Sequence, residues 1–238
     1  MHFHLPKPLH GWREFAGEVG IIVLGVLIAL GAEQVVEAAH QRQEGAEAER
    51  IIRSEVDLNL GRLQSRMEIH GCVVRRIDEI QKLLDGVASD PNIVTPGWIG
   101  RPQYWTYLNS RWQAESQAGR AALVDASRLS DYGMMYARMQ NLLDEMGIEQ
   151  TDWAKLRTLE HLRRLDRGAA LDFNVTLQDA RYRNWRLALV TEQLFDMAKT
   201  LHLRATPNAT AADRSICLPI TTTRAEGDRA SVWPVGEP

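Results

Sequence analysis

Apolar residues are distributed unevenly along the chain, and their spacing predicts a mainly helical protein. Residues 19–32 carry no charged side chain, and Glu18 and Glu33 bound this run. Farther along, apolar residues recur at intervals of three, four or seven, which is the spacing of one face of an amphipathic helix. The first such series consists of Ile52, Val56, Leu60, Leu63, Met67, Val74, Ile77 and Leu84.

Glycines leave open whether this helix continues directly from the apolar run. Gly45, Gly61 and Gly71 each lower the stability of a helix by about 1 kcal/mol relative to alanine, so a break is an alternative to a continuous helix. The sequence DGVASDPNIVTPG at 85–97 contains two prolines and two glycines and lacks periodicity. It predicts a loop.

Four more helices are expected after this loop, over roughly 103–118, 126–146, 153–165 and 171–203, with a pause at Gly119 between the first two. Asp125 or Ser127 is suited to cap the second helix, and Gly147 is suited to stop it. Thr151 and Asp152 are suited to cap the third.

The last helix is expected to face the core with one stripe. That stripe consists of Leu177, Trp185, Leu189, Leu194, Met197 and Leu201. Beyond it, proline, threonine and small residues predict an extended tail, with a short strand near 216–222 that has no obvious partner.

These segments predict an all-α fold, in which an N-terminal transmembrane helix is followed by a bundle of long antiparallel helices. The expected parts are a leader at 1–14, the transmembrane helix at 15–37, the bundle at 41–204 and the extended tail at 205–238. The sequence contains neither the alternation of strands and helices typical of a parallel sheet nor an internal repeat.

The apolar run at 19–32 has three interpretations. A core helix would keep a polar stripe, which this run lacks. A signal peptide would have an acid-free leader, whereas Glu14 and Glu18 precede this run. A membrane span fits best, because the 22 residues 15–36 form a helix of about 33 Å, and the hydrocarbon core is about 30 Å thick. Trp12 would then lie at the interface as an aromatic anchor.

The stretch REFAGEVGIIVLGVLIALGAEQ at 13–34 resembles the signature of a family of uncharacterised bacterial membrane proteins. Members of that family have a short basic leader, a glutamate, a span ending near GxLIAL and a mostly helical domain. A looser likeness continues over 111–139. The family is a domain of unknown function, so the resemblance implies a single-pass inner-membrane protein but no activity. The leader of this chain is longer and richer in histidine and proline than the family leads us to expect.

Charges near the span do not fix its orientation. Lys7 and Arg13 precede the span, and Arg42 and Arg50 follow it, so the positive-inside rule does not decide. A short leader usually stays in the cytoplasm, which predicts a periplasmic C-terminal domain.

Two cysteines, Cys72 and Cys217, are too few for a disulfide framework. We expect two unpaired, mostly buried thiols, with one bridge as the alternative in an oxidising compartment. The net charge of −3 gives no basic footprint for nucleic acid, so we expect no nucleic-acid partner.

A cluster of aromatic residues at 98–112 is the most notable candidate site. It includes Tyr107, and the residues proposed to contact a ligand or partner are Trp98, Arg101, Tyr104, Trp105, Arg111 and Trp112. Apolar walls with a few polar groups are typical of ligand pockets. Core packing and contact with the membrane surface are the alternatives.

One face of the span carries small residues. Glu18, Gly25, Ala29 and Ala32 lie near one line along the helix, and small residues permit close packing of helices. This face predicts a homo-oligomer or a partner membrane protein, besides the lipid bilayer itself. Chance composition is the alternative.

Other motifs do not point to a chemistry. His2, His4 and His10 suit a metal only if the leader is ordered, and His161 and His202 lack a ligand pattern, so we expect no metal, cofactor or catalytic residue. Basic clusters at 161–167 and 181–186 are expected to be solvated faces, with an anionic ligand as the alternative. The predicted function is a membrane-anchored scaffold or sensor domain that binds a partner or ligand. The alternative is an anchored enzyme with an unrecognised site in the bundle.

Overall fold

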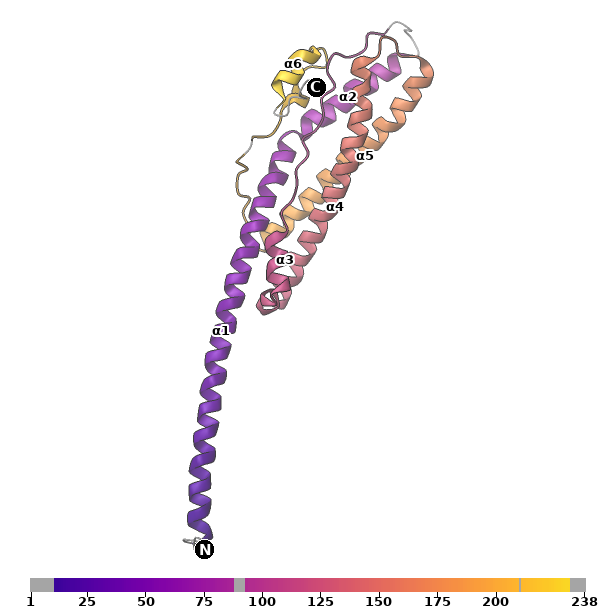
Figure 1. Ribbon diagram of the computed structural model, residues 1–238. Coiled ribbons are helices and arrows are strands. Elements are labelled where there is room, and N and C mark those ends of the chain that lie inside the picture. Colours follow the sequence, from indigo (N-terminus) through magenta and orange to yellow (C-terminus); the bar gives the residue numbers. More distant parts are fainter. Residues whose placement is uncertain (1–10, 88–92, 210, 232–238) are drawn as a thin grey trace, which may run out of the picture.

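The structure is a computed structural model that describes residues 11–87, 93–209 and 211–231. The described residues are helical with connecting loops and contain no strand (Figure 1). The α-helices are α1 (Trp12–Glu68), α2 (His70–Gly86), α3 (Ser110–Gln117), α4 (Ala126–Arg157), α5 (Arg167–Thr200) and α6 (Arg224–Ala230). The 3-10 helices are η1 (Arg120–Leu123), η2 (Thr158–His161) and η3 (Ser215–Cys217). The all-α fold class is therefore confirmed.

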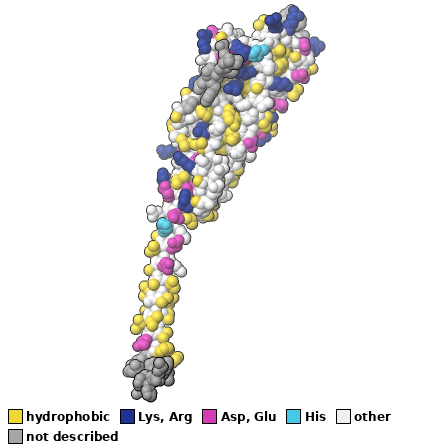
Figure 2. Space-filling view, viewed as in Figure 1, with side chains coloured by type: hydrophobic (Ala, Val, Ile, Leu, Met, Phe, Trp, Pro, Cys, Tyr) yellow, Lys and Arg dark blue, Asp and Glu magenta, His cyan; other side chains and the backbone are white. Residues whose placement is uncertain are grey.

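Helix α1 is continuous from the apolar run into the bundle. Its 57 residues give a length of about 85 Å. The N-terminal half extends alone from the bundle, and its side chains are exposed (Figure 1). This half is long and apolar enough to cross a membrane. Hydrophobic side chains cover it, and acidic side chains gather where it approaches the bundle (Figure 2).

Two glycines of α1, Gly45 and Gly61, serve close packing and do not break the helix. A Cβ atom at Gly45 would lie 2.4 Å from the carbonyl oxygen of Leu123, and one at Gly61 would lie 1.7 Å from the carbonyl oxygen of Thr206. The backbone of other segments thus passes directly over α1 at both positions. The helix ends at Glu68, and α2 starts after Ile69.

Two hydrophobic clusters form the core. The first joins the C-terminal half of α1 to α4 and to the C-terminal half of α5, with Ile52, Val56, Leu60, Tyr132, Met139, Met146 and Leu194 among its buried members. The second joins α2 to the end of α4 and the start of α5, with Val73, Ile77, Ile80, Trp153, Phe173 and Leu177 among its buried members. Helices α4 and α5 contribute to both clusters and therefore connect the two ends of the bundle.

The predicted boundaries of α4 are partly correct. Asp125 caps it, because its carboxylate accepts hydrogen bonds from the backbone amides of Ser127 and Arg128. The predicted stop at Gly147 is wrong, since α4 continues to Arg157. Buried residues lie on both sides of this glycine, so packing holds the helix together where the local signal favours an end.

The expected helix start near Gln103 is also wrong, because α3 begins only at Ser110. The preceding segment is extended and is held by side chains. Asn59 of α1 forms two hydrogen bonds with the backbone of Leu108, and Gln103 accepts one from the amide of Asp213. The expected pause at Gly119 is confirmed, since its φ of 76° lies in the left-handed region that favours glycine.

The inward stripe predicted for α5 is only half correct. Leu177, Leu194 and Leu201 are buried, whereas Trp185 is 57% exposed and Leu189 is 38% exposed. In α2, Val74 likewise lies outside the core.

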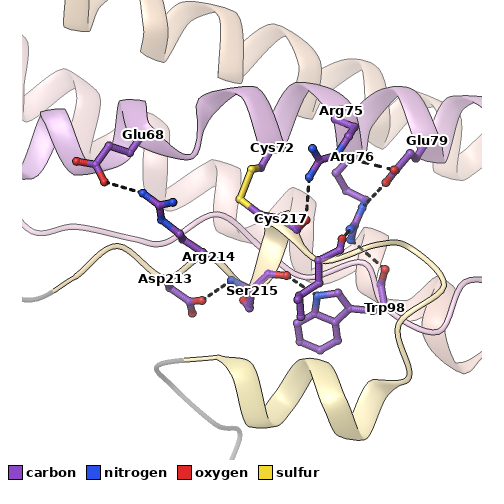
Figure 3. Close-up of a disulfide and its surroundings, with 11 residues drawn as sticks. Glu68, Cys72, Arg75, Arg76, Glu79, Trp98, Asp213, Arg214, Ser215 and Cys217 are labelled. Atoms are coloured by element: carbon purple, nitrogen blue, oxygen red, sulfur yellow. Dashed lines mark hydrogen bonds and ion pairs between the residues drawn. A yellow bond between two sulfur atoms is a disulfide. The ribbon is translucent and has the colours of Figure 1, made fainter.

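The segment from residue 205 onward is folded against the bundle over much of its described part. It contains η3 and α6, and no strand occurs at 216–222. Cys217 of η3 forms a disulfide with Cys72 of α2 (Figure 3). The expectation of two free thiols is therefore wrong.

Candidate functional site

The disulfide lies in a dense set of polar contacts between α2 and the C-terminal segment (Figure 3). Arg75 donates a hydrogen bond to the carbonyl oxygen of Cys217 at 2.8 Å. Arg214 pairs with Glu68 at 3.4 Å. The buried guanidinium of Arg76 pairs with Glu79 at 2.8 Å and also contacts the carbonyl oxygen of Leu218. These contacts hold the C-terminal segment on the surface of α2 and on the end of α1.

Trp98, the first residue of the aromatic cluster, has a structural role. Its ring is buried, and its indole nitrogen donates a hydrogen bond to the carbonyl oxygen of Ser215 at 2.8 Å. A Cβ atom at Gly227 would lie 2.2 Å from the ring, so α6 packs directly on the indole face. The guanidinium of Arg157 lies 5.2 Å from the ring centroid, within the range of a cation–π contact.

Trp112 and Arg111 belong to the packing of α3 against α1. The ring of Trp112 stacks on Tyr136 with centroids 5.0 Å apart. Glu55 is buried and accepts hydrogen bonds from the amides of Arg111 and Trp112 and from the hydroxyl of Tyr136. Burial and the neighbouring carboxylate of Glu55 raise the pKa of Tyr136 well above its usual range. These residues fix the start of α3.

The central residues of the cluster line a pocket of about 600 Å³. Arg101, Tyr104 and Trp105 of the predicted cluster contribute to it. The other lining residues are Arg62 of α1, Gln103 and Thr106 of the extended segment, Gln150 of α4 and Asp213 of the C-terminal segment. The structure thus divides the predicted cluster into a structural part and a part that faces a pocket.

The two arginines that line this pocket have few hydrogen-bond partners. Among the described residues, the guanidinium of Arg101 has no partner, and that of Arg62 contacts only the carbonyl oxygen of Thr106. The indole nitrogen of Trp105 is buried and has no hydrogen-bond acceptor among the described residues. The carboxylate of Asp213 is already used, since it accepts hydrogen bonds from the amide of Ser215 and the hydroxyl of Ser231. The free groups therefore favour an anion.

A set of buried polar side chains lies beside the pocket, because its member Glu149 precedes the pocket residue Gln150 on α4. Glu149 is fully buried and pairs with Arg66 at 2.8 Å, and Arg66 also donates to Asn184 at 3.2 Å. Burial raises the pKa of the Glu149 carboxyl, and Arg66 opposes that rise. Burial has the opposite effect on His70, whose side chain hydrogen-bonds Asn184: it lowers the pKa of the imidazole. This group connects α1, α4 and α5 through the core.

The proposed packing face of the span is open in this single chain. Glu18, Gly25, Ala29 and Ala32 all lie on the exposed half of α1. Apart from the backbone of its own helix, no atom of the described residues lies within 4 Å of a Cβ atom built at Gly25. The face is therefore available to lipid or to another helix.

The remaining motifs do not converge on a centre. Residues 11–87, 93–209 and 211–231 contain no group of three metal-ligating side chains close enough to hold an ion. His161 contacts Arg224, whereas His2, His4 and His10 lie outside the described residues. In the basic cluster at 181–186, all three arginines form ion pairs, as expected of a solvated face.

Sequence reasoning missed Arg62, Gln150 and Asp213, which complete the pocket. They lie far apart in the chain, and none belongs to a motif. It also missed Arg66 and Glu149, whose only sequence signal is a charged residue at an apolar position of a helical stripe. No protein-family model, curated protein or solved structure matches the chain. The resemblance at 13–34 therefore stays a prediction.

Proposed function

We propose that this chain is a single-pass protein of the bacterial inner membrane whose periplasmic helical domain binds a small organic anion. The observation that carries the proposal is the pocket at Arg62, Arg101, Tyr104 and Trp105, in which the two guanidinium groups have unused donors and the carboxylate of Asp213 already accepts hydrogen bonds.

The membrane location is supported by the N-terminal half of α1. An 18-residue stretch of this helix has a mean hydropathy of 2.3, and none of it is buried in the protein. Buried packing, which would explain such a stretch in a core helix, is therefore missing over this part of the described chain. Glu18 and Glu33 would lie near the two interfaces, where a charged side chain can reach the headgroups.

The periplasmic side is supported by the bond between Cys72 and Cys217. Disulfides form and persist in oxidising compartments and are rare in the cytoplasm. A short leader that stays in the cytoplasm gives the same orientation.

The ligand class follows from the chemistry of the pocket walls. Arginine guanidinium groups bind carboxylates through paired hydrogen bonds. The rings of Tyr104 and Trp105 offer flat apolar surface beside the arginines. A planar molecule with a carboxylate therefore suits the pocket, with its charge toward Arg62 and Arg101 and its ring toward the aromatic side chains.

The location is tested by fractionation and by reporter fusions to the full chain. We expect the protein to remain in the membrane after carbonate extraction, and a reporter that is active only in the periplasm to work when fused after Leu203. Recovery in the soluble fraction would refute the anchor, and activity of a cytoplasmic reporter alone at that position would refute the orientation.

Binding is tested by calorimetric titration of the purified full-length protein with 2-naphthoate and with its neutral analogue 2-naphthamide. We expect heat of binding for the acid only, and an affinity reduced at least about tenfold by Arg101→Met, as expected for loss of a charge-assisted hydrogen bond. Arg163 is exposed and has no ion pair within the described chain, so Arg163→Met is the matched control. Equal binding of the acid and the amide would refute an anion site.

A further inference from the structure

Helix α5 has two apolar faces, and only one of them is covered. The inner face packs against α2 and α4, and Thr176 is buried at its margin. The central line of this face consists of Ala170, Phe173, Leu177, Ala180, Asn184, Leu187, Thr191, Leu194 and Ala198. The second face is exposed and consists of Leu171, Val175, Gln178, Tyr182, Trp185 and Leu189. We call these six residues the outer seam.

The outer seam is regular. Its members are separated by four, three, four, three and four residues. At 100° per residue they lie within about 40° of one line, and they cover about 27 Å of helix. Leu171 is 65% exposed and Val175 is 63% exposed, so these are not residues at the margin of the core.

This spacing is that of a heptad repeat, which is typical of a helix paired with another helix. The inner face of α5 has the same alternation of three and four, and that face is packed against helices. On this helix, therefore, the spacing accompanies helix packing where the partner is visible. The same spacing on the opposite side indicates a second helical partner.

We propose that the outer seam pairs with the outer seam of a second copy of this chain, with the two α5 helices parallel. The parallel direction rests on the membrane anchor proposed above, because two copies anchored in one bilayer by α1 present α5 in the same direction. Identical residues then face each other across the dimer axis.

The side chains beside the seam give one pair of opposite charges in this arrangement. In a parallel pair, Arg167 faces Asp172 of the second copy, and Asn174 faces Asp179. Arg181 would face Arg186, but each is already neutralised within its own chain, by Asp78 at 2.9 Å and by Glu145 at 2.9 Å respectively.

One polar layer gives the seam a register. Gln178 occupies a core position of the repeat and hydrogen-bonds Gln81 of α2 at 2.8 Å. A single polar residue in such a repeat fixes register at some cost in stability. Gln178 facing its copy would favour the in-register pair over one shifted by a heptad.

The area of the seam is also sufficient. Covering its aromatic and aliphatic side chains would bury on the order of 500 Å² per copy and about 1,000 Å² in total, which is the minimum expected of a biological interface. Trp185 and Tyr182, whose rings lie 5.8 Å apart, supply the largest part.

Cysteine cross-linking of the full-length protein in native membranes tests the proposal. In a parallel pair, residue 175 faces its own copy, so Val175→Cys and Leu189→Cys should each give a covalent dimer under mild oxidation. Gln140→Cys, on an exposed position of α4, should give none. Trp185→Glu combined with Leu189→Cys should abolish the cross-link while the circular dichroism of the domain is kept.

Three results would overturn the proposal. Cross-linking only between Val175→Cys and Trp185→Cys chains would mean an antiparallel pair. An adduct with a different protein would mean that the seam serves another partner. Equal dimer from Gln140→Cys would mean random collision in the membrane. Carbonate extraction of the same membranes reports on the anchor separately, and binding of 2-naphthoate by the Trp185→Glu variant reports on the pocket.

Discussion

The buried pair of Arg66 and Glu149 makes a quantitative prediction about the core. Removing one partner by Glu149→Leu leaves the other charge buried, which typically costs about 3–5 kcal/mol. Arg66 is 3% exposed and therefore cannot reach solvent without movement of α1. Replacing both residues, as Arg66→Met with Glu149→Leu, removes both buried charges. Because such replacements are often neutral or stabilising, we expect the double variant to lie within about 1 kcal/mol of the wild type.

Unfolding of the full-length chain by urea in detergent, followed by tryptophan fluorescence, measures these free energies. Trp153 is buried one turn from Glu149 and serves as a local reporter. If each single variant loses about 3–5 kcal/mol and the double variant loses about 1 kcal/mol or less, the coupling energy between the two substitutions is at least about 5 kcal/mol. If the losses from the two single variants simply add in the double variant, the pair does not interact as the structure indicates.

The pH dependence of Arg66→Met checks the sign of the same effect. Without the arginine, burial and the nearby carboxylate of Asp152 raise the pKa of Glu149 further above its unfolded value of about 4.3, and only the more distant Arg183 opposes them. The neutral carboxyl then contributes stability that is fully present below the unfolded pKa and is lost as the pH rises through the folded pKa. Measured from pH 4 to 8, the free energy of unfolding of this variant should fall relative to that of the double variant.

Four further predictions concern other parts of the chain. Cys217→Ser opens a bridge that spans 145 residues, so the domain should lose about 2–5 kcal/mol, and a reductant should destabilise the wild type but not the variant. Gly227→Ala places a Cβ atom 2.2 Å from the buried indole ring and should cost about 1–3 kcal/mol, read as a lower melting temperature. Gly147→Ala, with open space around it, should not destabilise the domain. Gly25→Leu should weaken association in a membrane two-hybrid assay and Leu27→Ala should not; equal signals would assign any association to the helical domain.

Local signals in the sequence predicted those features that local chemistry determines. The Asp125 cap and the pause at Gly119 each depend on the conformation of one or two residues, and both are present in the structure. The apolar run at 19–32 likewise predicts a helix from its own length and composition, without knowledge of what it packs against. The all-α class followed from periodicity alone.

The errors arose where tertiary contacts decide. Gly147 does not stop α4, because burial on both sides of it outweighs the local preference. The periodicity of α5 predicts that Trp185 faces the core, whereas the structure exposes it. Two stripes with the same spacing run along α5, and periodicity does not say which of them faces inward. The pocket required Arg62 and Asp213, which only the fold brings together. The spacing of two cysteines 145 residues apart carries no information about pairing.

Because α1 is continuous, the orientation of the apolar run about the helix axis fixes the orientation of the helical domain about the same axis. One uninterrupted helix of 57 residues leads from the apolar run into the bundle, and no loop in it could absorb a twist. Any rotation of the span about its axis is therefore transmitted to the bundle as torque. Inserting one residue between positions 37 and 42 would turn the domain by about 100° relative to the span, whereas inserting four would turn it by only about 40°. In the proposed membrane arrangement, the number of residues between the span and the bundle thus sets which side of the domain faces its neighbours.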